Sequence, residues 1–190
     1  MSKVKFGLKN VHYAMATIAQ DGTATYGTPV RIPGAVSLSM EASGENTPFY
    51  ADDSVYFTAP GATGYTGDLS IALIPDSFRK DALGEDDSVE GILIETSDSS
   101  PKPFALLFEF TTDEKAQKHV LYNCTAKRPA IASQTKGEST EVQPETLSLT
   151  ASSIFNAALE KTMVKAKADP AAAAYADWYS SVFQPEGESI

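Results

Sequence analysis

The chain has 190 residues, of which 15 are basic and 25 acidic, so its formal net charge is −10. Apolar residues make up 42% and charged residues 21%, which are ordinary values for a folded domain and exclude wholesale disorder. This length favours a single domain over residues 1–190. No apolar run approaches the roughly 18 residues of a membrane-spanning helix, so we expect no membrane association.

The distribution of charge and the single cysteine give expectations about nucleic-acid binding and disulfide formation. Residues 32–101 hold 13 acidic and two basic residues, a net charge of −11. Such a surface repels phosphate and disfavours tight nucleic-acid binding, although a solvated acidic face that aids solubility is the simpler interpretation. Cys124 is the only cysteine, so no internal disulfide forms. The N-terminus has no hydrophobic signal core, and we expect synthesis and folding in the cytoplasm.

Alternation of apolar and polar residues predicts a mainly β protein. Asp21-Gly22 offers a hairpin turn, because this pair tolerates positive φ. The predicted strands, in chain order, cover residues 11–18, 36–40, 69–73, 104–110, 119–126, 142–151 and 162–168.

Two helices complete the expected α+β, mainly β fold. Asp76 is placed to cap a short helix over residues 77–83, with Gly84 just beyond its end. A C-terminal helix is expected over residues 169–184, with Pro170 at its first position. Its apolar stripe, expected to pack on the sheet of the same subunit, consists of Tyr175, Trp178, Tyr179 and Val182.

Residues 43–67 alternate poorly, and we expect a long loop between strands there. The segment holds four glycines and two prolines, but also five aromatic residues, which argues against simple disorder. We therefore expect a loop that becomes ordered by docking on a partner.

No catalytic constellation is recognisable. Asp52-Asp53 and Glu85-Asp86-Asp87 lack the ligand spacing of a calcium loop, and the glycines of residues 61–67 lack a phosphate-binding lysine. Cys124 occupies a strand-like position typical of a small buried residue. We predict a protein without enzymatic activity, metal or cofactor, although paired carboxylates of a hydrolase stay possible in any acidic β protein.

Seven stretches, taken in order along the chain, resemble the major tail proteins, or tail-tube proteins, of long-tailed bacteriophages and prophages. The resemblance covers most of residues 6–150, and its persuasive feature is the collinear order. The stretches are residues 6–14, Tyr26-Gly27-Thr28-Pro29, residues 32–38, Tyr50-Ala51-Asp52-Asp53, Thr66-Gly67-Asp68-Leu69-Ser70, residues 104–110 and Leu121-Tyr122-Asn123-Cys124.

The resemblance implies a β-sandwich or barrel-like domain with an N-terminal arm at residues 1–10. It also implies a virion tail built from stacked hexameric rings, through which DNA passes without specific binding, with tape-measure and tail-terminator or tail-tip proteins as partners. On this basis we expect the loop to join rings through Phe49, Tyr50, Asp52, Asp53, Val55, Tyr56 and Phe57. We expect the channel to be lined by Glu85, Asp86, Asp87 and Glu90.

A second interpretation belongs to a different class of protein. A β-sandwich binding module could use the same exposed tyrosines and phenylalanines as a platform for carbohydrate or for a cell-surface partner. Particle size separates the two, because a binding module stays small at every concentration.

Overall fold

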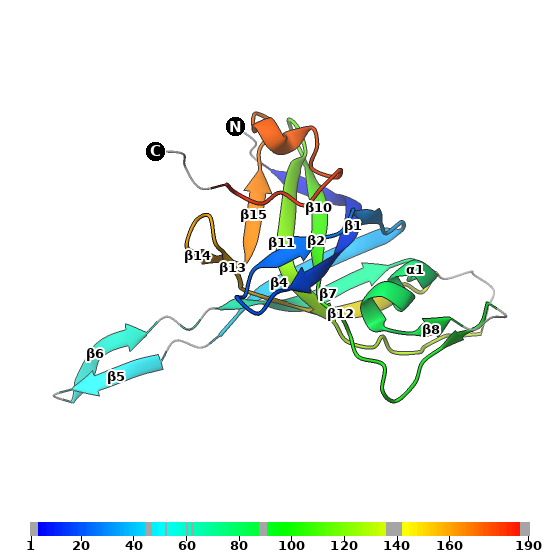
Figure 1. The fold of residues 1–190 in the computed structure, drawn as a ribbon, viewed down its shortest axis with the longest axis horizontal. Coiled ribbons are helices and arrows are strands. Elements are labelled where there is room, and N and C mark those ends of the chain that lie inside the picture. The colour runs from blue at the N-terminus through cyan, green and yellow to red at the C-terminus, as the bar shows by residue number, and fades with distance from the viewer. Residues whose placement is uncertain are drawn as a thin grey trace.

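The computed structural model describes residues 4–44, 47–51, 53–59, 61, 63–87, 91–135 and 142–186. Figure 1 shows a strand-rich domain with a short helical segment at one side and a projecting hairpin at the other. The elements are β1 (Lys5–Ile18), β2 (Ala24–Tyr26), β3 (Val30–Arg31), β4 (Ala35–Ser43), β5 (Thr47–Ala51), β6 (Ser54–Ala59), β7 (Gly64–Ile71), α1 (Asp76–Phe78), η1 (Arg79–Leu83), β8 (Asp86–Asp87), β9 (Leu93–Ile94), β10 (Phe104–Thr112), β11 (Gln117–Ala126), β12 (Glu145–Ser152), β13 (Ile154–Asn156), β14 (Lys161–Met163), β15 (Lys165–Ala168) and η2 (Ala173–Tyr175).

One antiparallel sheet of nine strands organises the described chain. Its order is β2–β1–β10–β11–β12–β7–β4, with β3 also paired to β1 and β15 to β11. Each strand predicted from alternation overlaps a strand of this fold, and Gly22, at φ 83°, lies in the predicted hairpin turn between β1 and β2. The mainly β prediction is confirmed.

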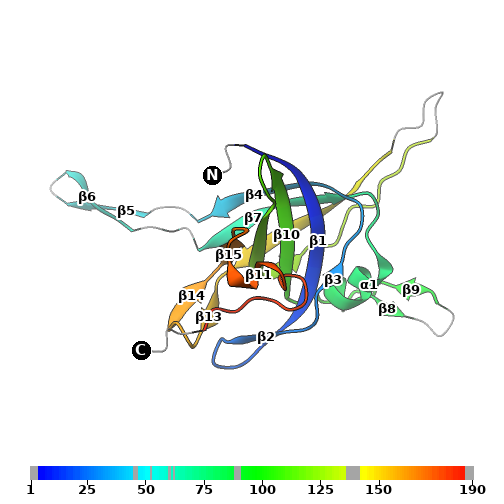
Figure 2. The same ribbon diagram turned by 90° about the horizontal axis from the view of Figure 1, so that it is seen from above.

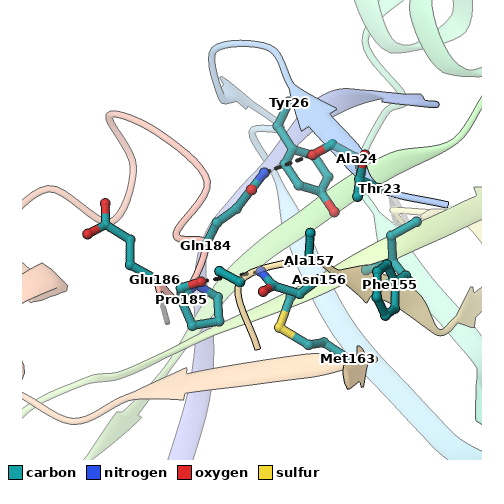
Figure 3. Close-up of a pocket in the computed structure, with 12 residues that line it drawn as sticks. Thr23, Ala24, Tyr26, Phe155, Asn156, Ala157, Met163, Gln184, Pro185 and Glu186 are labelled. Atoms are coloured by element: carbon teal, nitrogen blue, oxygen red, sulfur yellow. Dashed lines mark hydrogen bonds between the residues drawn. The ribbon is translucent and has the colours of Figure 1, made fainter. Parts of the chain in front are cut away.

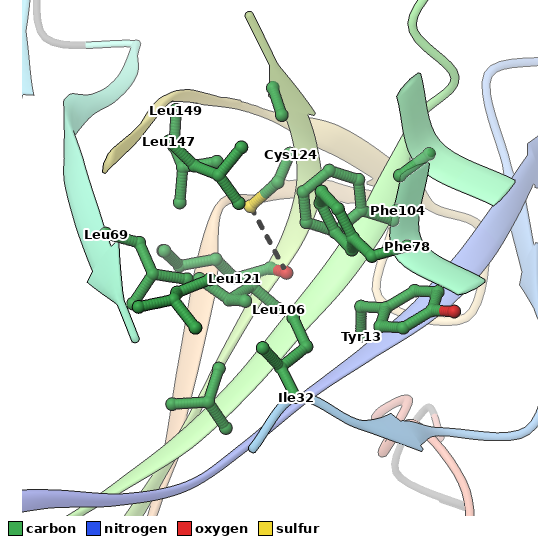
Figure 4. Packing of buried hydrophobic residues seen from close by; sticks show 14 of the residues in the cluster. Tyr13, Ile32, Leu69, Phe78, Phe104, Leu106, Leu121, Cys124, Leu147 and Leu149 are labelled. Carbon is green, nitrogen blue, oxygen red and sulfur yellow. Dashed lines mark hydrogen bonds between the residues drawn. The ribbon is translucent and has the colours of Figure 1, made fainter. Parts of the chain in front are cut away.

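The sheet curls around its main core. Tyr13 of β1 and Leu69 of β7 lie in one buried cluster with Leu106 of β10 (Figure 4), and Leu38 of β4 packs against this cluster. Strands from the two ends of the sheet therefore cover the same apolar interior. Cys124 lies in this cluster, fully buried as predicted, and burial raises the pKa of its thiol to about 12.

The opposite face of the central strands carries a second apolar cluster. Ala105 and Leu107 of β10 and Tyr122 of β11 lie there, while their neighbours along each strand face the main core. Both faces of β10 are thus covered, which explains why residues 104–108 form an uninterrupted apolar run.

The helical segment after β7 closes one end of the main core. Phe78 packs edge-on against Tyr13 and Phe104, with ring centroids 5.1 and 5.2 Å apart. The predicted helix is present as α1 and the π-helical turn η1, and Gly84 ends it at φ 75°. Asp76, however, is the first helical residue and makes no capping hydrogen bond, because Pro75 holds the N-cap position.

The prediction of an α-helix over residues 169–184 is wrong. Turns and the 3₁₀ helix η2 replace it, with 2.9–3.0 Å hydrogen bonds such as Tyr175 N–H to the Ala172 carbonyl and Ser180 N–H to the Asp177 carbonyl. The physical reason lies in contacts with the sheet, which fix this segment: Lys118 Nζ donates to the Tyr175 carbonyl at 2.7 Å, and the Tyr175 hydroxyl donates to the Ala116 carbonyl at 2.9 Å.

The apolar residues of this C-terminal segment nevertheless pack on the sheet of their own subunit, as expected. Trp178 is 2% exposed and Val182 is buried in the second cluster, with Tyr175 and Tyr179 packed against it. Trp178 Nε1 also donates to the His119 carbonyl at 3.3 Å. The side-chain pattern was therefore informative about burial even though the backbone conformation is not helical.

The expected N-terminal arm at residues 1–10 needs correction over residues 5–10, because β1 begins at Lys5 and pairs with β10. Gly7 and Asn10 have φ angles of 69° and 49°, close to the two register shifts of this pairing. Such bulges bend a strand. Because β1 is bent, it follows the curled sheet, and its first residues do not form a separate arm.

Candidate functional site

A β-hairpin projects from the domain between β4 and β7 (Figures 1 and 2). It consists of β5 and β6, paired antiparallel with Phe49 opposite Phe57, and Asp53 lies in its turn at φ 57°. This hairpin differs from the irregular loop expected over residues 43–67. Its sequence alternates poorly because a projecting hairpin does not bury one face on a core.

The hairpin presents aromatic side chains to solvent. Tyr50, Tyr56 and Phe57 are 65%, 74% and 59% exposed. Among the other residues predicted for a ring contact, Phe49 and Val55 lie on its strands and Asp52 falls outside the described residues. Exposed aromatic side chains gathered on one projection are a typical feature of a protein contact site.

The acids predicted to line a channel are placed unequally. Glu85 is 9% exposed, and its carboxylate lies 3.3 Å from the Arg79 guanidinium, so Glu85 is a structural group of the subunit. Asp86 and Asp87 are exposed on β8, where Asp87 pairs with Lys80. Glu90 falls outside the described residues.

Arg79 ties the helical segment to the sheet. Besides Glu85, it contacts a Glu145 carboxylate oxygen at 3.2 Å, and the other oxygen of Glu145 accepts the Ile74 N–H at 2.7 Å. These partners hold the helix end of the domain to the start of β12, close to the exposed acids of β8.

A second acidic surface, which sequence reasoning missed, lies on the outer face of β4, β7 and β12. Direct cross-strand pairing places nine polar residues in three rows, and neither a basic nor an apolar residue interrupts them. The Asp68 carboxylate accepts a hydrogen bond from the Ser148 hydroxyl at 2.8 Å. We call this surface the hydroxyl face; its rows are Ser37–Ser70–Thr146, Ser39–Asp68–Ser148 and Glu41–Thr66–Thr150.

Two polar side chains hold the C-terminal segment against the second cluster. The buried Lys118 ammonium lies 4.0 Å from the centre of the Tyr175 ring, and the Tyr179 hydroxyl donates to Glu109 at 3.1 Å. The other Glu109 oxygen accepts from the Asn10 amide at 2.8 Å. Because these polar groups are used in packing, they give no sign of a reactive centre.

A cleft of about 450 Å³ opens beside β2, β13 and the C-terminal segment (Figure 3). The amide of Asn156 donates to the Pro185 carbonyl at 3.3 Å, and that of Gln184 donates to the Ala24 carbonyl at 3.0 Å. The cleft therefore uses these amides to close its own walls. Burial raises the pKa of the Tyr26 phenol on one wall, so this hydroxyl stays protonated at neutral pH.

The described ranges of the chain offer neither a cluster of metal-binding side chains nor a membrane-spanning helix. Within them, no group of three or more histidine, cysteine, aspartate or glutamate side chains is arranged to hold a metal ion. The same ranges contain no helix with the length and apolar character needed to cross a membrane.

Comparison with known proteins adds one decisive observation to this geometry. A family model described as "Phage tail tube protein" matches residues 1–186 of the 190-residue chain. The chain belongs to the phage tail tube protein family. It is therefore a structural protein of the virion tail, and the tail-tube resemblance found in its sequence is confirmed. A search of curated proteins finds no match.

The three candidate contact surfaces of this tail tube protein differ in how far the sequence predicts them. The aromatic hairpin and the exposed acids of β8 were visible in the sequence, although only the fold places them at opposite sides of the domain (Figures 1 and 2). The hydroxyl face had a signal too: serine, threonine or an acidic residue alternates with an apolar residue or glycine over residues 37–41, 66–70 and 146–150. Only the strand pairing joins these three patterns into one surface.

Proposed function

We propose that the protein assembles into hexameric rings that stack into a hollow tail tube, the conduit through which DNA leaves the capsid. The observation that carries the proposal is the projecting aromatic hairpin on a protein of the tail tube family. A hairpin with exposed Tyr56 and Phe57 gains stability by burying these rings against another copy.

Ring-to-ring contact is the role we propose for this hairpin. Tyr50, Tyr56 and Phe57 supply the apolar area, and Asp53 shapes the turn. Within a ring, we propose that sheets of adjacent copies meet edge to edge. Strand β4, Ala35–Ser43, ends the described sheet and is nine residues long, which makes it a suitable edge for such pairing.

The channel wall is where the structure adds a candidate to those drawn from the sequence. The sequence predicts Glu85, Asp86, Asp87 and Glu90 as wall residues, but burial and pairing with Arg79 make Glu85 unsuitable. We propose the hydroxyl face instead, because its hydroxyls and the carboxylates of Glu41 and Asp68 offer no basic group that could hold a phosphate. DNA slides past such a wall without specific binding.

The virion partners proposed with this function are a tape-measure protein inside the tube and tail-terminator or tail-tip proteins at its ends. Synthesis in the cytoplasm of the bacterial host precedes assembly. These partners follow from the family and not from any particular contact surface of this chain.

Electron microscopy of the purified protein over a range of concentrations tests the proposal. We expect sixfold rings and tubes from the native chain. The double variant Tyr56→Ser, Phe57→Ser should stop at rings, while the control Val30→Ser, which changes an exposed apolar residue of β3, should form tubes. A native chain that stays monomeric at every concentration would refute the proposal and favour the binding-module interpretation.

A further inference from the structure

The main core has two chemically different ends. Strand directions define them: Tyr65 lies at the start of β7, beside the root of the hairpin, whereas Ile74 and Phe78, past the other end of β7, lie at the helical segment. An eight-residue strand spans roughly 25 Å, so the two ends are separate surfaces. Figures 1 and 2 place the hairpin and the β8–β9 pair on opposite sides of the molecule.

Lysines gather at the hairpin end. Lys165 Nζ lies 4.6 Å from the centre of the Tyr65 ring, and Lys5 Nζ lies 4.9 Å from that of Phe110. No carboxylate of the described chain forms an ion pair with either of these ammonium groups, while Lys167 has Asp169 at 3.3 Å. We call Lys5, Lys165 and Lys167 the lysine face.

His119 lies near all three lysines of this face. His119 pairs with Lys167 across β11 and β15, and its ring stacks on Phe108 with centroids 5.3 Å apart. Burial, then the fields of Lys167, Lys165 and Lys5, lower the pKa of His119 to about 4, with Asp169 acting in the opposite sense. Lys167 lies directly opposite His119 on β15, and the three lysines lower the pKa of this imidazole while Asp169 raises it.

Acids gather at the helix end. Residues 81–101 contain seven acidic residues and no basic one. Asp86 and Asp98 are exposed and line a cleft of about 340 Å³ together with Glu85, Lys80 and Lys102. Beside it lies a groove of about 500 Å³ whose walls include Met15, Ile18 and Pro103, with Ile18 42% exposed.

We propose that the lysine face of one copy docks on the acidic helix end of a second copy, next to the site where the hairpin of the first copy reaches the groove of the second. Complementary patches on opposite sides of one chain give a head-to-tail contact, which repeats along a stack without closing on itself. The hairpin leaves the same end that carries the lysines, so both features meet the helix end of the next copy together.

This inference rests on the proposed tube. It implies that the two ends of the tube differ, because every copy faces the same way along the stack. It assigns Asp86 to a contact between copies and leaves the channel wall to the hydroxyl face. The proposed occupant is a second copy of this chain because the lysine face and the acid-rich segment of residues 81–101 have opposite charge.

A charge-exchange experiment tests the contact. Tube formation is measured by light scattering and electron microscopy in low and moderate salt for Lys165→Glu with Lys167→Glu, for Asp86→Lys with Asp98→Lys, and for all four changes together. We expect each pair to raise the protein concentration needed for tubes at least about tenfold, and the fourfold variant to recover most of that loss. Recovery should weaken as salt rises.

Two control variants and a second pair of substitutions, which neutralises charge without reversing it, distinguish loss of the contact from loss of folding. Lys161→Glu on β14 and Asp177→Lys in the C-terminal segment reverse charges that belong to neither proposed contact group and should leave assembly unchanged. Thermal unfolding of each variant checks folding; if a reversal pair unfolds, Lys165→Gln with Lys167→Gln replaces it, with an expected increase of severalfold.

The outcomes separate this contact from the tube itself. Native chains that form no tubes would refute the proposed function. Native tubes with reversal variants that assemble equally well, or a fourfold variant that recovers nothing, would refute the lysine–acid contact alone. Normal tubes of Asp86→Lys with Asp98→Lys that retain DNA would place these acids in the channel and overturn the contact as well.

Discussion

At the scale of single residues, Trp178 shows how a side chain fastens a segment that has little regular structure of its own. Its indole is 2% exposed, donates to the His119 carbonyl and stacks on Phe183 with centroids 5.9 Å apart. Burying a ring of this size contributes roughly 2–3 kcal/mol by area, before the cost of leaving a cavity is added.

We therefore expect Trp178→Ala to lower the free energy of unfolding of the isolated subunit by about 3–5 kcal/mol. Denaturant unfolding monitored by circular dichroism measures this. Tyr56→Ala, which removes a ring that is 74% exposed, is the control and should change stability by less than about 0.5 kcal/mol. Unchanged subunit stability with lost assembly would identify the segment as an interface element.

His119 should make the subunit sensitive to acid. Its pKa in the folded chain, about 4, lies below the ordinary value of 6.5, so the unfolded chain takes up the proton first as the pH falls. Stability that is fully present above pH 6.5 is then lost progressively toward pH 4, by at most about 3 kcal/mol. His12 contributes in the same direction, because burial lowers its pKa as well.

The variant His119→Phe keeps an aromatic ring between Phe108 and Phe110 but cannot titrate. Unfolding midpoints of native and variant chains, measured from pH 7 to pH 4, should diverge, with the native chain losing more stability. Parallel pH profiles would show that His119 does not titrate differently in the two states.

At the scale of elements, β7 depends on a glycine in its middle. A Cβ at Gly67 would overlap the main-chain oxygen of Ser39 and lie 2.8 Å from Met40 Cα, because β4 approaches closely there. We expect Gly67→Ala to destabilise the subunit by about 1–3 kcal/mol. Gly27→Ala, where the nearest atom would be 3.8 Å away, is the matched control, and equal midpoints in thermal unfolding would contradict this account.

The hairpin is expected to behave differently in the subunit and in the tube. Its Tyr50, Tyr56 and Phe57 rings are solvent-exposed in the single chain, and its strands pair with each other and not with the main sheet. An isolated two-stranded hairpin is marginally stable. We therefore predict faster amide hydrogen exchange over residues 49–57 in the monomer than in the assembled tube. Equal protection in both states would remove the ring-contact role.

At the scale of the whole molecule, the channel can be located by charge reversal. Glu41→Lys with Asp68→Lys changes the hydroxyl face by four charge units per subunit. If this face lines the channel, tubes should form but DNA should be retained in them, with retention falling steeply as salt rises. DNA release from assembled particles at several salt concentrations measures this.

The same measurement on Asp86→Lys with Asp87→Lys examines the wall predicted from the sequence. Retention of DNA by this pair alone would place β8 in the channel, and normal release by the Glu41 and Asp68 pair at low salt would exclude the hydroxyl face. The two results together assign the wall, because the two surfaces lie on different strands of the fold.

Several features of this protein follow from the sequence alone, because they depend on local patterns. Alternation located the strands, since a half-buried strand repeats every two residues. Gly84 ended the short helix because its backbone is left-handed there. The seven stretches that resemble tail-tube proteins, taken in their order along the chain, identified the family. Trp178 and Val182 were recognised as packing residues from their spacing.

The tertiary structure decided what depends on contacts between distant segments. It replaced the C-terminal helix with turns that side-chain contacts such as Lys118 to the Tyr175 carbonyl hold against the sheet. It buried Glu85 beside Arg79, and it joined three separate serine and threonine patterns into the hydroxyl face. It also brought Lys5 to the lysines of β15, 160 positions along the chain. No local pattern encodes these juxtapositions, because each depends on how the sheet pairs and curls.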